Sequence, residues 1–100
     1  MRISKDEQAI IKRLAKQEFG GGTHVYIFGS RTDDNKKGGD IDLFVTNQSQ
    51  QKLTLKAKIR FLAKLKSVIG DQKIDVVLDT KATQSKKSFY QSIKQNAVEI

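Results

Sequence analysis

Apolar positions along the chain follow a helical period in some segments and form short strand-like runs in others. Residues 4–18 have apolar side chains at helical spacing, preceded by a capping box made of Ser4 and Glu7. A long second helix is expected over residues 50–69 and a last helix over residues 85–95. Three strands are predicted, over residues 24–28, 40–45 and 73–79.

The apolar positions also predict which helix faces are buried. Phe89 and Ile93 are expected to anchor the last helix. In the long second helix the expected apolar side consists of Leu55, Ile59, Leu62, Leu65 and Ile69. The order α-β-β-α-β-α predicts an α+β fold of α/β type, with a short mixed three-stranded sheet flanked by helices. The whole of residues 1–100 is expected to form one domain.

Composition narrows the chemistry. The 100 residues contain 19 Lys and Arg against 11 Asp and Glu, a net charge of +8, which favours acidic or polyanionic partners. There is no cysteine and a single histidine, His24, so disulfides, thiolate sites and multi-histidine zinc sites are excluded. No apolar run approaches the roughly 20 residues of a membrane span, and no signal region begins the sequence. We expect a cytoplasmic protein without a membrane partner.

Carboxylates stand out on two of the predicted strands. Asp40 and Asp42 are two residues apart on one strand, so their side chains project from the same face. Asp75 offers a third carboxylate from another strand. Unpaired like charges this close repel, and a divalent cation such as Mg²⁺ removes that penalty. If the two strands are neighbours, the three carboxylates converge on a space suited to two metal ions.

A possible phosphate-binding turn lies upstream of these carboxylates. Gly29 follows a strand, where a glycine lets the backbone turn tightly and approach a ligand closely. The Ser30 hydroxyl and neighbouring backbone N–H groups could then hold a phosphate. Arg31, Lys36 and Lys37 could add positive charge over a triphosphate. Each feature alone is more often a simple turn or a solvated strand edge, so the inference depends on their combination.

That combination resembles the DNA polymerase β-type nucleotidyltransferase superfamily, and most of all its minimal nucleotidyltransferases, which are short catalytic domains. Nearly the whole chain takes part in the resemblance. The segments that carry it are Gly29-Ser30, then Asp40-Ile41-Asp42 after nine intervening residues, and Ile74-Asp75-Val76-Val77. The intervening loop is one residue shorter than is usual in the family and more acidic and polar than its common arginine-rich version.

The resemblance implies a role for each matching residue. Asp40 and Asp42 would hold Mg²⁺, two ions in the family, and Asp75 would complete the metal site where the attacking hydroxyl is deprotonated. Gly29 and Ser30 would seat the β- and γ-phosphates of ATP. The reaction would be nucleotidyl transfer, in which an acceptor hydroxyl attacks the α-phosphorus and pyrophosphate leaves.

The resemblance also implies a partner. The family's frequent partner is a small helical protein of the HEPN class, and the pair often acts as a toxin–antitoxin system. There the nucleotidyltransferase is the antitoxin and attaches AMP to a tyrosine of the toxin. Nucleotidylation of a small molecule is a further alternative, less favoured because a separate acceptor-binding domain is not evident.

A basic stripe suggests a second class of function. Asp and Glu are absent from residues 43–70, and the lysine and arginine positions that recur there at i, i+4 are Lys52, Lys56, Arg60 and Lys64. One interpretation is a solvated helix face; the other is a docking surface for an acidic protein or nucleic acid. On the docking interpretation the chain is a weak or inactive nucleotidyltransferase that neutralises its partner by binding. Lys58 lies within the apolar arc, where it either extends its ammonium to solvent or meets an interface.

Overall fold

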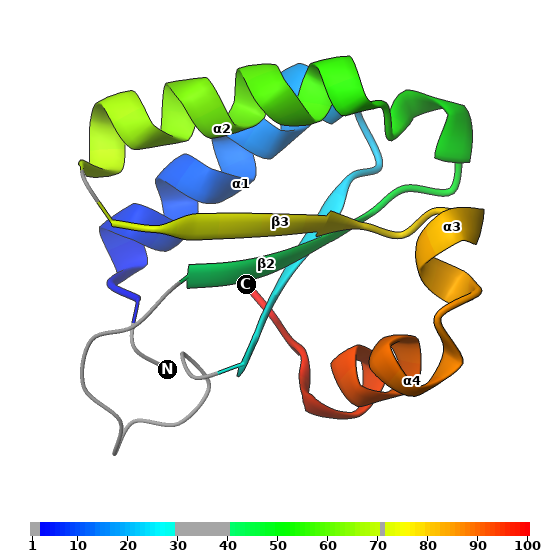
Figure 1. Cartoon of the computed structure of the whole chain (residues 1–100). Helices are drawn as coiled ribbons and strands as arrows, with labels where there is room; N and C mark the ends of the chain where they lie inside the picture. The colour runs from blue at the N-terminus through cyan, green and yellow to red at the C-terminus, as the bar shows by residue number, and fades with distance from the viewer. Residues whose placement is uncertain (1–2, 30–40, 71) are drawn as a thin grey trace.

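The computed structural model of the chain describes residues 3–29, 41–70 and 72–100. A four-stranded sheet is covered by helices on both faces, so that α1 and α2 lie together on one side and α4 lies on the other (Figure 1). The elements are α1 (Lys5–Phe19), β1 (His24–Phe28), β2 (Ile41–Thr46), η2 (Gln50–Lys52), α2 (Leu55–Ile69), β3 (Ile74–Leu78), α3 (Lys81–Gln84), α4 (Lys87–Asn96) and β4 (Val98–Glu99).

The sheet has the strand order β3-β2-β1-β4. β1 pairs antiparallel with both β2 and β4, whereas β2 and β3 are parallel. The prediction of a mixed sheet flanked by helices is confirmed, but the predicted number of three strands is wrong. β4 spans two residues, which is too short for an alternating pattern to reveal it in the sequence.

Local signals explain where the helices begin and end. The Ser4 side chain accepts a hydrogen bond from the Glu7 N–H at 3.1 Å, and the Glu7 carboxylate accepts one from the Ser4 N–H at 3.1 Å, which completes the expected capping box. The segment expected as one helix over residues 50–69 is instead a 3₁₀ turn followed by α2. Thr54 separates them because its hydroxyl accepts a hydrogen bond from the Ala57 N–H at 3.1 Å and so caps α2.

The main core lies between the sheet and the helix pair α1 and α2. The buried side of α2 is formed by Ala57, Phe61 and Leu65, with the Phe61 ring packed edge-on against Phe19 of α1 at 5.5 Å between centroids. The predicted apolar side of α2 is therefore wrong in part, since Leu55 is 69% exposed and Ile59 is 57% exposed. The smaller Ala57 and the flat Phe61 ring face α1 and the sheet, and this turns Leu55 and Ile59 toward solvent.

A smaller apolar cluster lies on the opposite face of the sheet, under α4. The Phe44 ring contacts Tyr26 at 6.2 Å and Tyr90 at 6.1 Å between centroids. Ile93 is fully buried there, as expected, but Phe89 is 43% exposed and does not anchor α4. Burial raises the pKa of the Tyr90 phenol, and a hydrogen bond with Asp79 raises it further.

Helices of the described residues lack the length and apolar character that crossing a membrane requires.

Candidate active site

Two of the predicted carboxylates meet at one end of the sheet. Asp42 of β2 and Asp75 of β3 are direct partners in the parallel ladder, so both side chains project from the same face. On the other neighbouring strand, β1, Phe28 is the partner of Asp42 in the antiparallel ladder. The expectation that Asp42 and Asp75 belong to neighbouring strands is therefore met. This face is the one on which α4 packs, because the intervening residues Leu43 and Val76 point into the main core.

Gly29 has no side chain, and this leaves space for the Asp42 carboxylate. A β-carbon built at Gly29 would collide with the Oδ2 atom of Asp42, and the φ of Gly29 is +76°. Both observations require glycine at this position. The close approach of Gly29 to a ligand stays a prediction; among the described residues, Gly29 lies close to the Asp42 carboxylate. The glycine thus leaves room for the carboxylate as β1 ends.

The two carboxylates open on a cavity of about 490 Å³. One cation, Lys58 of α2, also lines it. The other lining side chains are apolar and comprise Phe28, Leu62, Ile74, Val76, Val77 and Phe89. In the sequence Lys58 is unusual for its place in an apolar arc, but nothing there connects it to the acidic residues. The position of Lys58 inside an apolar arc was the one sequence feature that pointed to a special role. That Lys58 lines this cavity depends on how α2 lies over β3.

Repulsion between the two carboxylates favours the binding of a cation beside them. Neighbouring strands are about 4.8 Å apart. Two like charges about 5 Å apart repel by about 1 kcal/mol in water and about 3 kcal/mol at an effective dielectric constant of about 20. Placing two carboxylates side by side therefore has a cost that a bound cation removes. Carboxylate oxygens are the hard ligands that Mg²⁺ prefers.

Five of the predicted site residues lie outside the described residues. These are Ser30, Arg31, Lys36, Lys37 and Asp40. Within residues 3–29, 41–70 and 72–100, no group of three or more histidine, aspartate or glutamate side chains could hold a metal ion. Because Asp40 is not among them, the predicted set of three carboxylates stays a prediction. Asp42, Asp75 and Gly29 are the predicted residues that the structure brings together.

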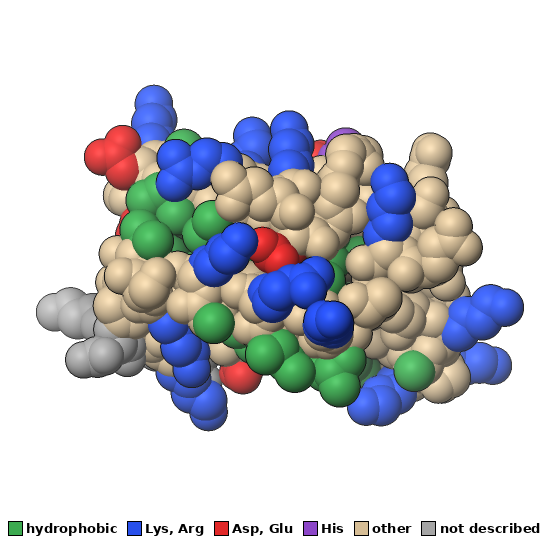
Figure 2. Space-filling model, turned by 90° about the horizontal axis from the view of Figure 1, so that it is seen from above, with side chains coloured by type: hydrophobic (Ala, Val, Ile, Leu, Met, Phe, Trp, Pro, Cys, Tyr) green, Lys and Arg blue, Asp and Glu red, His purple; other side chains and the backbone are tan. Residues whose placement is uncertain are grey.

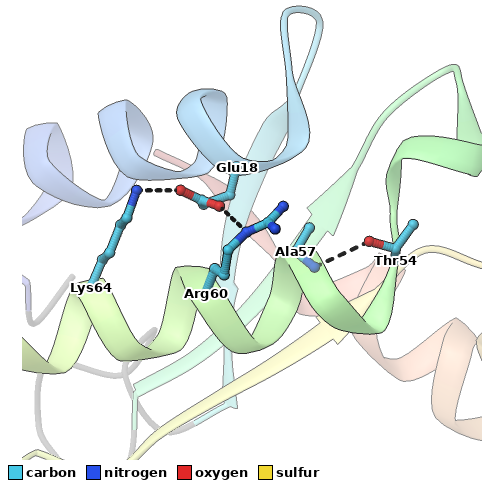
Figure 3. Close-up of polar contacts among 5 residues, drawn as sticks. All are labelled: Glu18, Thr54, Ala57, Arg60 and Lys64. Carbon is cyan, nitrogen blue, oxygen red and sulfur yellow. Dashed lines mark hydrogen bonds and ion pairs between the residues drawn. The ribbon is translucent and has the colours of Figure 1, made fainter.

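The predicted basic stripe is partly occupied by an internal contact. The Glu18 carboxylate at the end of α1 accepts a hydrogen bond from Arg60 Nε at 2.9 Å and from Lys64 Nζ at 2.6 Å (Figure 3). The Glu18 side chain is only 6% exposed, since the two cations cover it. The Lys64 and Arg60 hydrogen bonds lower the pKa of Glu18.

Glu18 was missed from the sequence because it lies on a different helix, 42 residues before Arg60. Seen from above, the surface formed by α1 and α2 carries many cations around a small acidic area (Figure 2). Lys52 lies in η2 and Lys56 at the exposed side of α2. The stripe therefore divides into two residues that hold α1 against α2 and two that face solvent. Its role in partner binding stays a prediction.

His24 is placed as a structural residue. Its Nδ1 atom is 2.7 Å from Oε2 of Glu99, which joins the start of β1 to β4 across the sheet. This contact is at the opposite edge of the sheet from β3. His24 therefore has a partner within the sheet, and it does not line the cavity beside Asp42 and Asp75.

Comparisons with known proteins agree with this geometry. Residues 8–100 match the family model described as polymerase beta, nucleotidyltransferase. Among solved structures, a mutant form of the toxin–antitoxin MntA–HpeT is similar in fold, with a TM-score of 0.68 and 18% sequence identity. The match covers 92% of this chain and 70% of that one. No curated protein sequence matches the chain.

Proposed function

Because the chain belongs to the polymerase beta nucleotidyltransferase family, we propose that it transfers AMP from ATP to a hydroxyl group in a magnesium-dependent reaction. The observation that carries this proposal is the pairing of Asp42 with Asp75 on one face, beside a cavity of about 490 Å³. In the reaction the acceptor oxygen bonds to the α-phosphorus of ATP, the bond to the β-phosphate breaks, and pyrophosphate leaves. The hydroxyl proton passes to a base at the site.

The donor set of the site fits Mg²⁺. Asp42 and Asp75 supply hard carboxylate oxygens from adjacent strands, and Asp40 would add a third. Bound there, Mg²⁺ would neutralise the triphosphate and stabilise charge on the attacking and leaving oxygens. Asp75, which is exposed on β3, would accept the proton of the acceptor hydroxyl. Gly29 leaves room for the Asp42 carboxylate, while Ser30 and Arg31 would contact the phosphates.

We propose that the acceptor belongs to a protein partner, a toxin of the small helical HEPN class, and that the acceptor group is a tyrosine hydroxyl. The fold similarity to a toxin–antitoxin protein supports an antitoxin role. The cavity supports a protein acceptor as well, because its walls are mostly apolar apart from the carboxylates and Lys58. The competing function is neutralisation by binding alone, which the exposed cations Lys52 and Lys56 favour.

Labelled ATP separates these functions. The purified chain is mixed with Mg²⁺, ATP and the toxin that is expressed together with it. The ATP carries its label on either the α- or the γ-phosphate. Transfer of the α-label but not the γ-label to the toxin is expected, and Asp75→Asn should abolish it. Asp6→Asn, the same change at the first turn of α1, is the matched control and should leave transfer intact. Neutralisation of the toxin by Asp75→Asn without any transfer would favour the binding function.

A further inference from the structure

An apolar surface lies along the outer side of α2 and continues onto α4. Leu55 and Ile59 are one helical turn apart on α2 and are both largely exposed, and Leu62 follows on the same side. Phe89 of α4 adds an exposed ring. Seen from above, hydrophobic side chains gather along one long margin of the molecule, the margin toward which β3 lies (Figure 2). Large exposed apolar side chains that are grouped in this way mark interaction surfaces.

In the part of the chain that the structure describes, no strand pairs with the outer edge of β3, beside this surface. β3 is the last strand in the order, and within the described residues it pairs with β2 alone. The Lys73 carbonyl accepts a hydrogen bond from the Ile41 N–H of β2 at 2.9 Å, so odd-numbered residues of β3 direct their backbone groups toward β2. The alternating pattern of a strand then directs the backbone N–H and C=O groups of Ile74 and Val76 to the open side.

Two cavities follow this open edge, of about 490 and 450 Å³. They share Lys58, Val76, Val77 and Phe89, so they form one continuous depression between α2 and α4. We call it the β3-edge groove; the residues that define it here are Leu55, Lys58, Leu62, Val76, Lys86 and Phe89. One end of the groove contains Asp42 and Asp75, and the other end is lined by Leu55 and Lys86.

Charge decides what kind of molecule fits the groove. Lys58 and Lys86 line it, Lys66 lies on the same side of α2 as Leu55 and Ile59, and residues 43–70 contain no acidic residue. A second copy of this chain would bring the same excess of cations, from a net charge of +8. Nucleic acid would satisfy the lysines but would leave the exposed leucine and isoleucine side chains unmatched. An acidic polypeptide with apolar side chains satisfies both.

We propose that the β3-edge groove binds an extended, acidic segment of a protein partner, which adds a strand beside β3. Its backbone pairs with the outward N–H and C=O groups of Ile74 and Val76. Its apolar side chains pack against Leu55 and Phe89, which line the groove, and against the exposed Ile59 beside it, and its Asp and Glu side chains lie near Lys58 and Lys86. Addition of a strand to a free sheet edge is a common mode of peptide recognition. Binding does not require transfer activity, although the groove leads from this surface to the carboxylates.

A photo-crosslinking amino acid at position 55 or 89 tests the proposal in cells that naturally express the chain. We expect both positions to crosslink to one acidic protein, identified by mass spectrometry, and we expect no such product from position 12 on α1. The purified captured protein then serves as the probe in a binding titration. Leu55→Gln combined with Ile59→Gln should weaken binding at least tenfold. Val98→Gln, which changes an exposed apolar residue on β4, is the matched control.

Two further measurements define the mode of binding. Amide hydrogen exchange at Ile74 and Val76 should slow on binding, and Lys86→Glu should weaken binding and its salt dependence. Crosslinks to nucleic acid or to a second copy of the chain, the absence of any crosslink, or unchanged exchange at Ile74 and Val76 would overturn the proposal. Removal of Mg²⁺ with a chelator should leave partner binding intact, since the groove contacts need no metal, whereas it should stop the proposed transfer. Loss of the proposed transfer activity and loss of this docking surface are therefore separate results.

Discussion

The two faces of one sheet divide stability and chemistry between alternate residues of the same strands. On the face toward α1 and α2, Ile41, Leu43 and Val45 of β2 are fully buried. On the opposite face, Phe44 is buried under α4, while Asp42 remains beside the open cavity. Because strand side chains alternate, the chain places a continuous core and a pair of carboxylates within a few residues of each other. Changes at neighbouring positions should therefore have quite different consequences.

The largest expected effect is a loss of activity on the open face. Asp42→Asn keeps the size of the side chain but removes the charge that would hold Mg²⁺. We expect nucleotidyl transfer to fall by about a thousandfold, which corresponds to about 4 kcal/mol in the activation barrier. The rate at which the label of α-labelled ATP is transferred to the partner measures this change. The thermal unfolding temperature of the variant should be equal to or higher than that of the parent chain, because the change removes the repulsion with Asp75. Transfer at the parental rate would remove Asp42 from the site.

The next effect is a loss of stability on the covered face. Leu43→Ala removes a fully buried side chain from the main core and should lower the free energy of unfolding by about 3 kcal/mol. Asp75→Ala, on the opposite face and exposed, should lower it by no more than about 0.5 kcal/mol, and relief of the repulsion with Asp42 should offset even that. Urea unfolding of both variants makes the comparison. Equal destabilisation by the two changes would contradict the division of roles between the faces.

Gly29→Ala should connect the two properties, with a smaller effect on each. The added methyl group is strained at a φ of +76° and collides with the Asp42 carboxylate. We expect stability to fall by about 1–2 kcal/mol and transfer by about ten- to a hundredfold. Gly21→Ala is a useful control, because a β-carbon there meets nothing within 4 Å. Parallel unfolding and transfer assays would reveal whether stability and activity change together at position 29.

The smallest effect concerns the ion pairs between the two helices. The pKa of Glu18 is lowered in the folded chain from its ordinary value of 4.5. Its contribution is therefore present above about pH 4.5 and disappears as the pH falls through the folded pKa. Glu18→Gln should cost about 1 kcal/mol at pH 7. The difference between parent and variant should shrink on acidification, and a difference that grows at low pH would contradict this sign.

Much of the fold could be predicted because local signals agreed with tertiary packing. The capping box at Ser4 and the alternation in β2 and β3 placed the elements to within a few residues. β4 could not be found, since its two residues are fixed by pairing with β1 and not by their own pattern. The exposed side of α2 was mispredicted because Leu55 and Ile59 continue the helical apolar period. The period alone cannot tell a core-facing residue from one at an open groove.

The candidate site divides in the same way. The spacing of Asp42 and Asp75 within their strands was visible in the sequence, but their adjacency depended on β2 and β3 being parallel neighbours. Two features of the site depended on close approach between segments far apart in the sequence. These are the space that Gly29 leaves for Asp42 and the presence of Lys58 in the cavity. Pairing of Glu18 with Arg60 and Lys64 likewise required the packing of α1 on α2.

Paramagnetic broadening by Mn²⁺ tests the central claim most directly, that the open face of the sheet holds a divalent cation and a nucleotide. Mn²⁺ accepts the same oxygen ligands as Mg²⁺ and broadens the amide signals of nearby residues. With a non-hydrolysable ATP analogue present, broadening should centre on Gly29, Asp42 and Asp75. It should disappear in the Asp42→Asn, Asp75→Asn double variant. Broadening that centres on His24 and Glu99 instead, or that persists in the double variant, would contradict the account.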